Sequence, residues 1–145
     1  MALASLFGGL ALANAGLGAV HGFAGPIGGM FSDAPHGAIC AALLPHVMTA
    51  NICALRRRDA QSPALKGYDR IARICTGDEH GSADAGVTWV RELIDELQIP
   101  RLGTYGVKAE HVDKLVGKAT QASSMKANPI TLTPDELAET LQQAL

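Results

Sequence analysis

The stretch that most constrains this chain is residues 14–51, which is largely apolar and contains three of the five histidines. Residues 1–20, which overlap the beginning of this stretch, carry no charged side chain. A helix that is apolar on every side has to be buried, either in a protein core or in a membrane. Glycine and proline interrupt the stretch at several points, so it predicts more than one helix. We therefore expect any chemistry in this chain to involve the histidines of this stretch.

Two of these histidines, His21 and His36, are expected at helix ends. The apolar run before His21 predicts a helix that ends there, because the glycines and the proline of residues 22–29 follow. The segment before His36 predicts a second helix start, with Asp33 as the N-cap and Pro35 in the first turn. A compact turn between the two helices would bring both imidazoles to one point. Neutral imidazole is a good ligand for Zn, Fe, Ni or Cu.

The same two histidines also have a simpler interpretation, as helix caps or satisfied polar groups. Two ligands do not form a tight metal site, because a catalytic zinc site usually takes three ligands from the protein. The sequence offers no obvious further set, since it contains no His-x-x-x-His and no Cys-x-x-Cys. From the spacing alone, both interpretations stay open.

Several motifs resemble, in the same order, one family of enzymes. They are Gly18-Ala-Val-His21-Gly, Gly25-Pro-Ile-Gly-Gly29, Pro35-His36-Gly37, Leu43-Leu-Pro-His-Val-Met48, Tyr68-Asp-Arg-Ile-Ala-Arg73, Glu92-Leu-Ile-Asp-Glu-Leu-Gln-Ile-Pro100, Ala127-Asn-Pro129 and Leu132-Thr-Pro-Asp-Glu136. Together they resemble the C-terminal helical domain of the iron-containing (group III) alcohol dehydrogenases. The likeness covers nearly all 145 residues.

The resemblance implies a metal-binding role for His21 and His36, which match the third and fourth metal ligands of the family. It implies Fe(II) or Zn as the metal. The first two ligands of the family, an Asp and a His one helical turn apart, are expected in a segment preceding Met1, as is the NAD(P)-binding domain. We therefore expect a single helical domain over residues 1–145, with half of a metal site and no catalytic or cofactor-binding residue of its own.

The chain departs from the family pattern at two points in this region. Many members carry a second histidine four residues after the third ligand, where it is thought to relay protons, and this chain has Gly25 there. The separation of His21 and His36 is also one residue longer than the resemblance leads us to expect. The extra residue is expected in the segment 31–33, where a loop can absorb it.

Composition excludes several classes of partner. The net charge is -2 and aromatic residues make up 4% of the chain, so neither a basic field nor a stacking platform for nucleic acid is present. The three cysteines, Cys40, Cys53 and Cys75, are odd in number and irregularly spaced. They are interpreted as small buried residues in a reducing compartment, so we expect a cytoplasmic protein.

A membrane span near the N-terminus is not expected. Several glycines lower the hydrophobicity of the apolar run of residues 1–20, and no basic residue flanks this run. The run is also barely as long as the ~20 residues that a spanning helix needs. We therefore expect a buried core helix over these residues, and neither a membrane nor a nucleic acid as a partner.

The remainder of the chain predicts further helices and no strand. A long apolar helix is expected over residues 36–57, with His46 directed away from His36. Further helices are expected from Pro63, after Ser82, over residues 112–119 and after Thr133, which begins a capping-box motif. Since no segment alternates with a period of two, the sequence predicts an all-α helical bundle.

Three functions are compatible with these features. The first is the metal-binding helical part of an NAD(P)-dependent enzyme that interconverts alcohols with aldehydes or ketones, inactive until another polypeptide supplies the rest. The second is a non-enzymatic remnant that self-associates as a homo-oligomer through an exposed apolar surface. The third is a small metal-binding protein that uses His21 and His36 across an oligomer interface.

Overall fold

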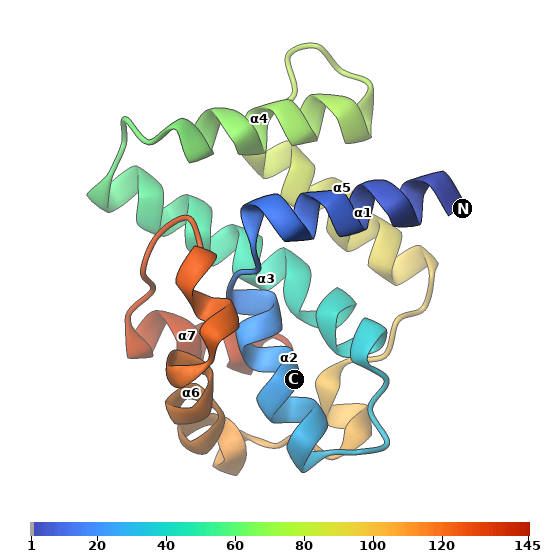
Figure 1. Ribbon diagram of the computed structural model, residues 1–145, viewed down its shortest axis with the longest axis vertical. Helices are drawn as coiled ribbons and strands as arrows, with labels where there is room; N and C mark the ends of the chain where they lie inside the picture. The colour runs from blue at the N-terminus through green and yellow to red at the C-terminus, as the bar shows by residue number, and fades with distance from the viewer. Residues whose placement is uncertain (1) are drawn as a thin grey trace.

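The computed structural model describes residues 2–145 and contains only helices in that range, which confirms the predicted all-α fold (Figure 1). The α-helices are α1 (Ala2–Ala15), α2 (Ala19–Met30), α3 (His36–Arg58), α4 (Pro63–Thr76), α5 (Ala83–Glu96), α6 (Val112–Gln121) and α7 (Pro134–Gln143). Three short 3₁₀ helices connect them, namely η1 (Leu102–Tyr105), η2 (Ala109–His111) and η3 (Ser123–Ala127). The helix starts predicted at Pro63, after Ser82 and after Thr133 are therefore confirmed.

The long helix α3 is the centre of the bundle and belongs to two apolar clusters. In the larger cluster it packs with α2, α6 and α7, through fully buried side chains that include Phe23, Ile27, Ile39, Leu43, Leu115, Leu137 and Leu141. In the smaller cluster, Met48 and Ile52 of α3 pack against Ala83 and Val87 of α5. Each large side chain fully buried in this way stabilises the fold by about 1.5–3 kcal/mol. Figure 1 shows α3 between the α4–α5 pair and the group formed by α2, α6 and α7.

By length and composition, α3 would be able to cross a membrane, and so would the pair α1 and α2 if their bend of 104° were ignored. In α3, 56% of the most apolar window is buried against the other helices. Its apolar composition therefore matches its place in the core of the bundle.

Local capping fixes where the peripheral helices begin and end. The Ser82 side chain accepts a hydrogen bond from the backbone N–H of Ala85 at the start of α5. At the start of α7, Thr133 and Glu136 form the predicted capping box, with side chain to backbone distances of 3.2 and 2.8 Å. Helix α4 ends at Gly77, whose φ of 72° is in the left-handed region that glycine favours.

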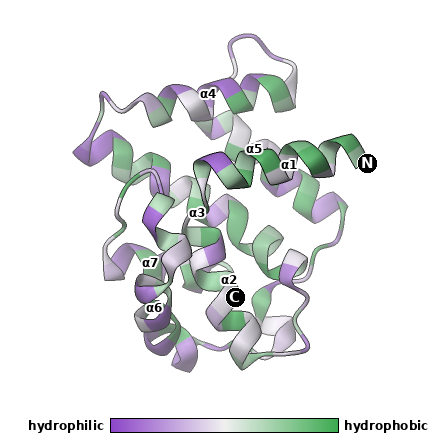
Figure 2. Cartoon of the chain, viewed as in Figure 1, coloured by the Kyte–Doolittle hydropathy of each residue, from purple (hydrophilic) through white to green (hydrophobic). Residues whose placement is uncertain are grey.

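The prediction of a buried core helix over residues 1–20 is wrong. Helix α1 contains no buried residue, and Leu3, Leu6, Phe7, Leu10 and Leu12 are each between 48% and 62% exposed. In Figure 2, α1 is hydrophobic along most of its length. The helix ends at Ala15, and Gly16 follows with a φ of 70°. Apolar composition predicted a need for burial, but no other helix of residues 2–145 covers α1.

The predicted turn after His21 is also wrong. Residues 19–30 form one continuous helix, α2, although Pro26 and four glycines lie within it. His21 therefore lies in the first turn of a helix and not at the end of one. The predicted Asp33 cap is absent, because Pro35 is the N-cap residue of α3 and no side chain caps that end. The prediction that His36 begins the next helix is confirmed.

Candidate metal centre

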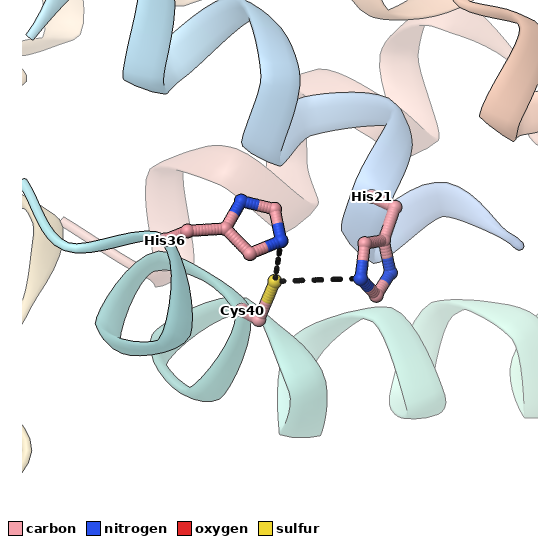
Figure 3. A group of neighbouring side chains, drawn as sticks. All are labelled: His21, His36 and Cys40. Atoms are coloured by element: carbon pink, nitrogen blue, oxygen red, sulfur yellow. Dashed lines mark hydrogen bonds between the residues drawn. The ribbon is translucent and has the colours of Figure 1, made fainter. Parts of the chain in front are cut away.

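His21 and His36 lie side by side although 15 positions separate them in the sequence. Their ring centroids are 5.3 Å apart and the ring planes are inclined by 49°. His21 projects from the first turn of α2 and is half-buried, while His36 projects from the start of α3 and is exposed. Figure 3 shows the two imidazoles turned toward one point between α2 and α3.

A third donor, the thiol of Cys40, lies between the two rings. Its Sγ atom is 3.5 Å from Nε2 of His36 and 3.9 Å from Nε2 of His21 (Figure 3). One ligand atom from each of the three residues lies within 4.8 Å of the other two. Sequence reasoning missed Cys40, which was interpreted as a small buried residue. The signal was present, because His36-x-x-x-Cys40 places both side chains on one face of a helix.

The start of α2 is held by a side chain from a distant part of the chain. The carboxamide oxygen of Asn128 accepts a hydrogen bond of 3.0 Å from the backbone N–H of Ala19, two residues before His21. The amide nitrogen of Asn128 donates to the side-chain oxygen of Asn51 at 2.7 Å and to the backbone oxygen of Ile130 at 2.8 Å. Since Asn51 is buried in α3, this network fixes α2 against α3 and so fixes the separation of the two imidazoles.

A close contact beside His21 brings α2 near η3. A Cβ atom at Gly22 would lie 2.6 Å from Cε of Met125, so glycine leaves the room that this side chain occupies. Gly18 has a similar role, because a Cβ atom there would lie 2.8 Å from Oδ1 of Asn128. The glycines that predicted a break are therefore sites of close packing within and next to a helix.

Burial shifts the protonation equilibria of two of the three donors. Burial lowers the pKa of His21, and the neighbouring His36 lowers it further. The His21 ring is thus neutral at physiological pH, which is the form that binds a metal. Burial raises the pKa of the Cys40 thiol above its usual range. The three-residue group contains no carboxylate.

The donor geometry fits a divalent metal ion. Ligand atoms about 2.0–2.3 Å from a tetrahedral zinc ion lie about 3.3–3.8 Å from one another. The separations from the Cys40 sulfur to the imidazole nitrogens of His36 and His21, 3.5 and 3.9 Å, are close to that range. Imidazole and thiolate are both established ligands of transition metals.

The other three histidines lie outside this group. His80 is exposed, and Nδ1 of His111 accepts a hydrogen bond of 3.0 Å from the backbone N–H of Lys108. His46 is half-buried in α3, and its Nδ1 atom is buried without a hydrogen-bond partner in residues 2–145. Burial is the main cause that lowers the pKa of His46. The expectation that His46 is directed away from His36 agrees with this arrangement.

None of the three cysteines is in a disulfide, as the sequence predicted. The expectation that all of them are buried is wrong, because Cys53 is exposed and Cys40 and Cys75 are only half-buried. Cys53 lies on α3, outside the cluster of donors.

A family model described as the C-terminal region of the Fe-containing alcohol dehydrogenase family matches residues 1–145. Alcohol dehydrogenase 4 of Schizosaccharomyces pombe is 36% identical over 146 residues, which cover 100% of this chain and 32% of the relative. The 1,3-propanediol dehydrogenase of Klebsiella pneumoniae is 35% identical over 145 residues, covering 99% of this chain and 36% of the relative. The chain spans about a third of the length of these curated relatives.

Solved structures show the same fold. The crystal structure of a 1,3-propanediol oxidoreductase matches with a TM-score of 0.80 and 30% identity, covering 98% of this chain and 36% of that chain. An alcohol dehydrogenase from Oenococcus oeni matches with a TM-score of 0.79 and 30% identity, covering 94% of this chain and 35% of that chain. Because the sequence match runs over the whole chain and the fold agrees, this chain belongs to the iron-containing alcohol dehydrogenase family, where it corresponds to the C-terminal region.

Proposed function

We propose that this chain is the metal-binding helical part of an NAD(P)-dependent, iron-containing alcohol dehydrogenase of the cytoplasm. The enzyme interconverts alcohols with aldehydes or ketones. The observation that carries the proposal is the convergence of His21 and His36, with ring centroids 5.3 Å apart, in a chain of this family. Its relatives named 1,3-propanediol dehydrogenase and lactaldehyde reductase support a small alcohol or aldehyde as the substrate.

His21 and His36 would hold the metal, Fe(II) or Zn. A metal bound there would supply Lewis-acid polarisation of the substrate oxygen, and a nicotinamide cofactor would carry the hydride. The chain positions the two imidazoles: Asn128 holds the start of α2, and the packing of α2 on α3 sets the imidazole separation. Gly25 provides no imidazole for a proton relay, so protons have to reach the substrate by another route.

The proposed enzyme includes more than this helical part. The chain spans about a third of the length of its relatives. We assign the exposed apolar surface of α1, defined by Leu3, Leu6, Phe7, Leu10 and Leu12, to contact with the nucleotide-binding part of the enzyme. Covering such a surface removes apolar area from water and stabilises the pair.

A chimeric enzyme tests this function. The C-terminal third of the Klebsiella pneumoniae 1,3-propanediol dehydrogenase is replaced by this chain, and NADH formation from 1,3-propanediol is measured with added Fe(II) or Zn. The chimera is expected to be active, and His36→Ala is expected to lower kcat/KM about 100-fold or more, because several kcal/mol of charge stabilisation are lost. His80→Ala, an exposed histidine outside the centre, is the matched control and leaves kcat/KM unchanged. A His36→Ala chimera as active as the unmodified one overturns the proposal.

A second candidate function is favoured by the exposure of α1. An apolar surface of this kind also suits a non-enzymatic helical module that self-associates as a homo-oligomer, with or without a metal at the interface. Sedimentation of the 145-residue chain at micromolar concentration separates the two functions. A dimer that Leu6→Glu converts to a monomer, with no activity in the chimera, supports the module. If the unmodified chain and Leu6→Glu are both monomers, the self-associating module is excluded.

A further inference from the structure

We propose that Cys40 is a third protein ligand of this metal centre, so that the centre suits a thiophilic divalent cation such as zinc. The inference rests on the proposed function, because it concerns the same centre. It goes beyond the family resemblance, which assigns only His21 and His36 as ligands in this chain. Three donors from this helical part also mean that it binds the metal by itself.

The position of Cys40 follows from the local structure. His36 is the first residue of α3, and Cys40 lies one helical turn later on the same face. The Sγ atom is therefore directed to the side of α3 that faces α2, where His21 projects (Figure 3). The sulfur lies within 3.9 Å of both Nε2 atoms, and no other donor of the His, Cys, Asp or Glu type within residues 2–145 joins the group.

The three donors have the number and the chemistry of a zinc site. Catalytic zinc is held by three protein ligands, with a fourth position left for water or substrate. Thiolate is a soft ligand that favours zinc, whereas Mg²⁺ and Mn²⁺ prefer oxygen ligands, and this group provides none. On binding, the S–H bond of Cys40 is replaced by a sulfur–metal bond and the proton passes to the solvent, so no oxidant or reductant is needed.

Cobalt provides a spectroscopic test with a readout other than activity. Co²⁺ is titrated into the 145-residue protein under reducing conditions, and absorption is recorded for the unmodified chain, Cys40→Ala, Cys40→Ser and Cys53→Ala. The unmodified chain is expected to show the near-ultraviolet thiolate-to-cobalt charge-transfer band, and zinc is expected to displace the cobalt. Both Cys40 variants are expected to lose that band and to bind cobalt about tenfold or more weakly, since even loss of an indirect metal partner costs 10–100-fold. Cys53→Ala, an exposed cysteine on the same helix, is expected to behave like the unmodified chain.

Alkylation of the thiols gives a second readout that does not depend on cobalt. Zinc is expected to slow the reaction of Cys40 with iodoacetamide about tenfold or more, because a coordinated thiolate is not free to react. Cys53 and Cys75 in the same sample serve as internal references whose rates do not change. Far-UV circular dichroism and the melting temperature establish that each variant is folded before its metal affinity is compared.

The outcomes separate this inference from the proposed function. Cobalt binding of equal affinity in the unmodified chain and both Cys40 variants, with no charge-transfer band, overturns the ligand role of Cys40 and leaves the histidine site intact. Absence of metal binding in both the unmodified chain and His36→Ala overturns the inference and the metal-binding part of the proposed function together. Loss of the band and of affinity in the Cys40 variants alone supports the inference.

Discussion

Helices α1 and α2 are neighbours in the sequence and similar in composition, yet they differ completely in burial. Both are rich in alanine and glycine, and neither carries an acidic residue in its first turn or a basic residue in its last turn. Every residue of α1 that the structure describes is exposed, whereas Phe23 and Ile27 of α2 are fully buried. The site residue His21 belongs to the buried helix. The comparison shows that an apolar helix is buried only where other elements are arranged to cover it.

The difference has a physical cause in the connections that each helix makes. Asn128 and Asn51 fix the start of α2, and the close approach of Met125 at Gly22 brings η3 onto it. Gly8 and Gly9 of α1 have no neighbouring atom within 4 Å of a Cβ atom built on them. Helix α2 is therefore part of the folded core, whereas α1 is an exposed apolar helix on the surface of the bundle.

The largest expected difference between the two helices comes from a matched pair of phenylalanines. Phe23→Ala in α2 is expected to lower the free energy of unfolding by about 3–5 kcal/mol, because it leaves a cavity in the core. Phe7→Ala in α1, where the side chain is 59% exposed, is expected to change it by less than about 0.5 kcal/mol. Urea unfolding followed by circular dichroism measures both. Equal losses in the two variants would mean that α1 is packed as firmly as α2.

Two asparagines provide the next comparison. Asn128→Ala is expected to lower the free energy of unfolding by about 1–3 kcal/mol, because it leaves polar groups of Ala19 and the buried Asn51 without partners. Asn14→Ala in α1 removes only an exposed hydrogen bond to the backbone oxygen of Leu10 and is expected to cost less than about 0.5 kcal/mol. The same urea experiment applies. A negligible effect of Asn128→Ala would show that this network does not hold α2 in place.

Glycine-to-alanine substitutions are expected to have opposite signs in packed and exposed helices. Gly86→Ala in α5 is expected to cost about 1–3 kcal/mol, because the added methyl group would lie 2.9 Å from Cβ of Ala72 in α4. The methyl group added by Gly8→Ala in α1 has no atom within 4 Å. This substitution is expected to stabilise the helix locally by about 0.5–1 kcal/mol and so to increase its helicity. Thermal melting and far-UV circular dichroism report the two effects. Stabilisation by Gly86→Ala would contradict the close packing of α4 on α5.

The smallest expected effect is a dependence of stability on pH. Helix α1 has no titratable side chain, whereas α3 carries His46, whose pKa is lowered by burial and by the charges of Arg91 and Arg101. The folded state disfavours protonation of His46. The contribution of neutral His46 to the free energy of unfolding is therefore fully present above about pH 6.5 and is lost as the pH falls below that value. Urea unfolding at pH 8 and pH 5.5 measures this loss, which is expected to be smaller in His46→Gln. An identical loss of stability in the unmodified chain and in His46→Gln would exclude His46 as the cause of the pH dependence.

Much of the fold was predictable from local signals. Capping motifs at Thr133 and Ser82 predicted helix starts correctly, because a cap is determined by the few residues that form it. The helical spacing of Val112 and Leu115 predicted a buried face that the structure confirms. The continuity of α2 through Pro26 was not predictable, because tertiary packing by Asn128 and η3 compensates for the poor helix propensity of that segment.

The candidate centre was predictable in part. Resemblance to the family pointed to His21 and His36, and the structure brings their rings together, although His21 lies in the first turn of a helix and not at a helix end. Cys40 was not predicted as a ligand because it belongs to no His-x-x-x-His or Cys-x-x-Cys motif. A mixed His-x-x-x-Cys spacing carries the same geometric information as His-x-x-x-His, since both place two donors on one helical face.

The central claim, that His21 and His36 hold a metal ion, is tested most directly by metal analysis. The 145-residue chain and the His21→Ala/His36→Ala variant are purified in parallel, exposed to zinc or Fe(II), freed of unbound metal and analysed by mass spectrometry. The account predicts about one metal ion per unmodified chain and close to none in the variant, because neither chelating imidazole remains. An equally low metal content in both proteins would contradict it.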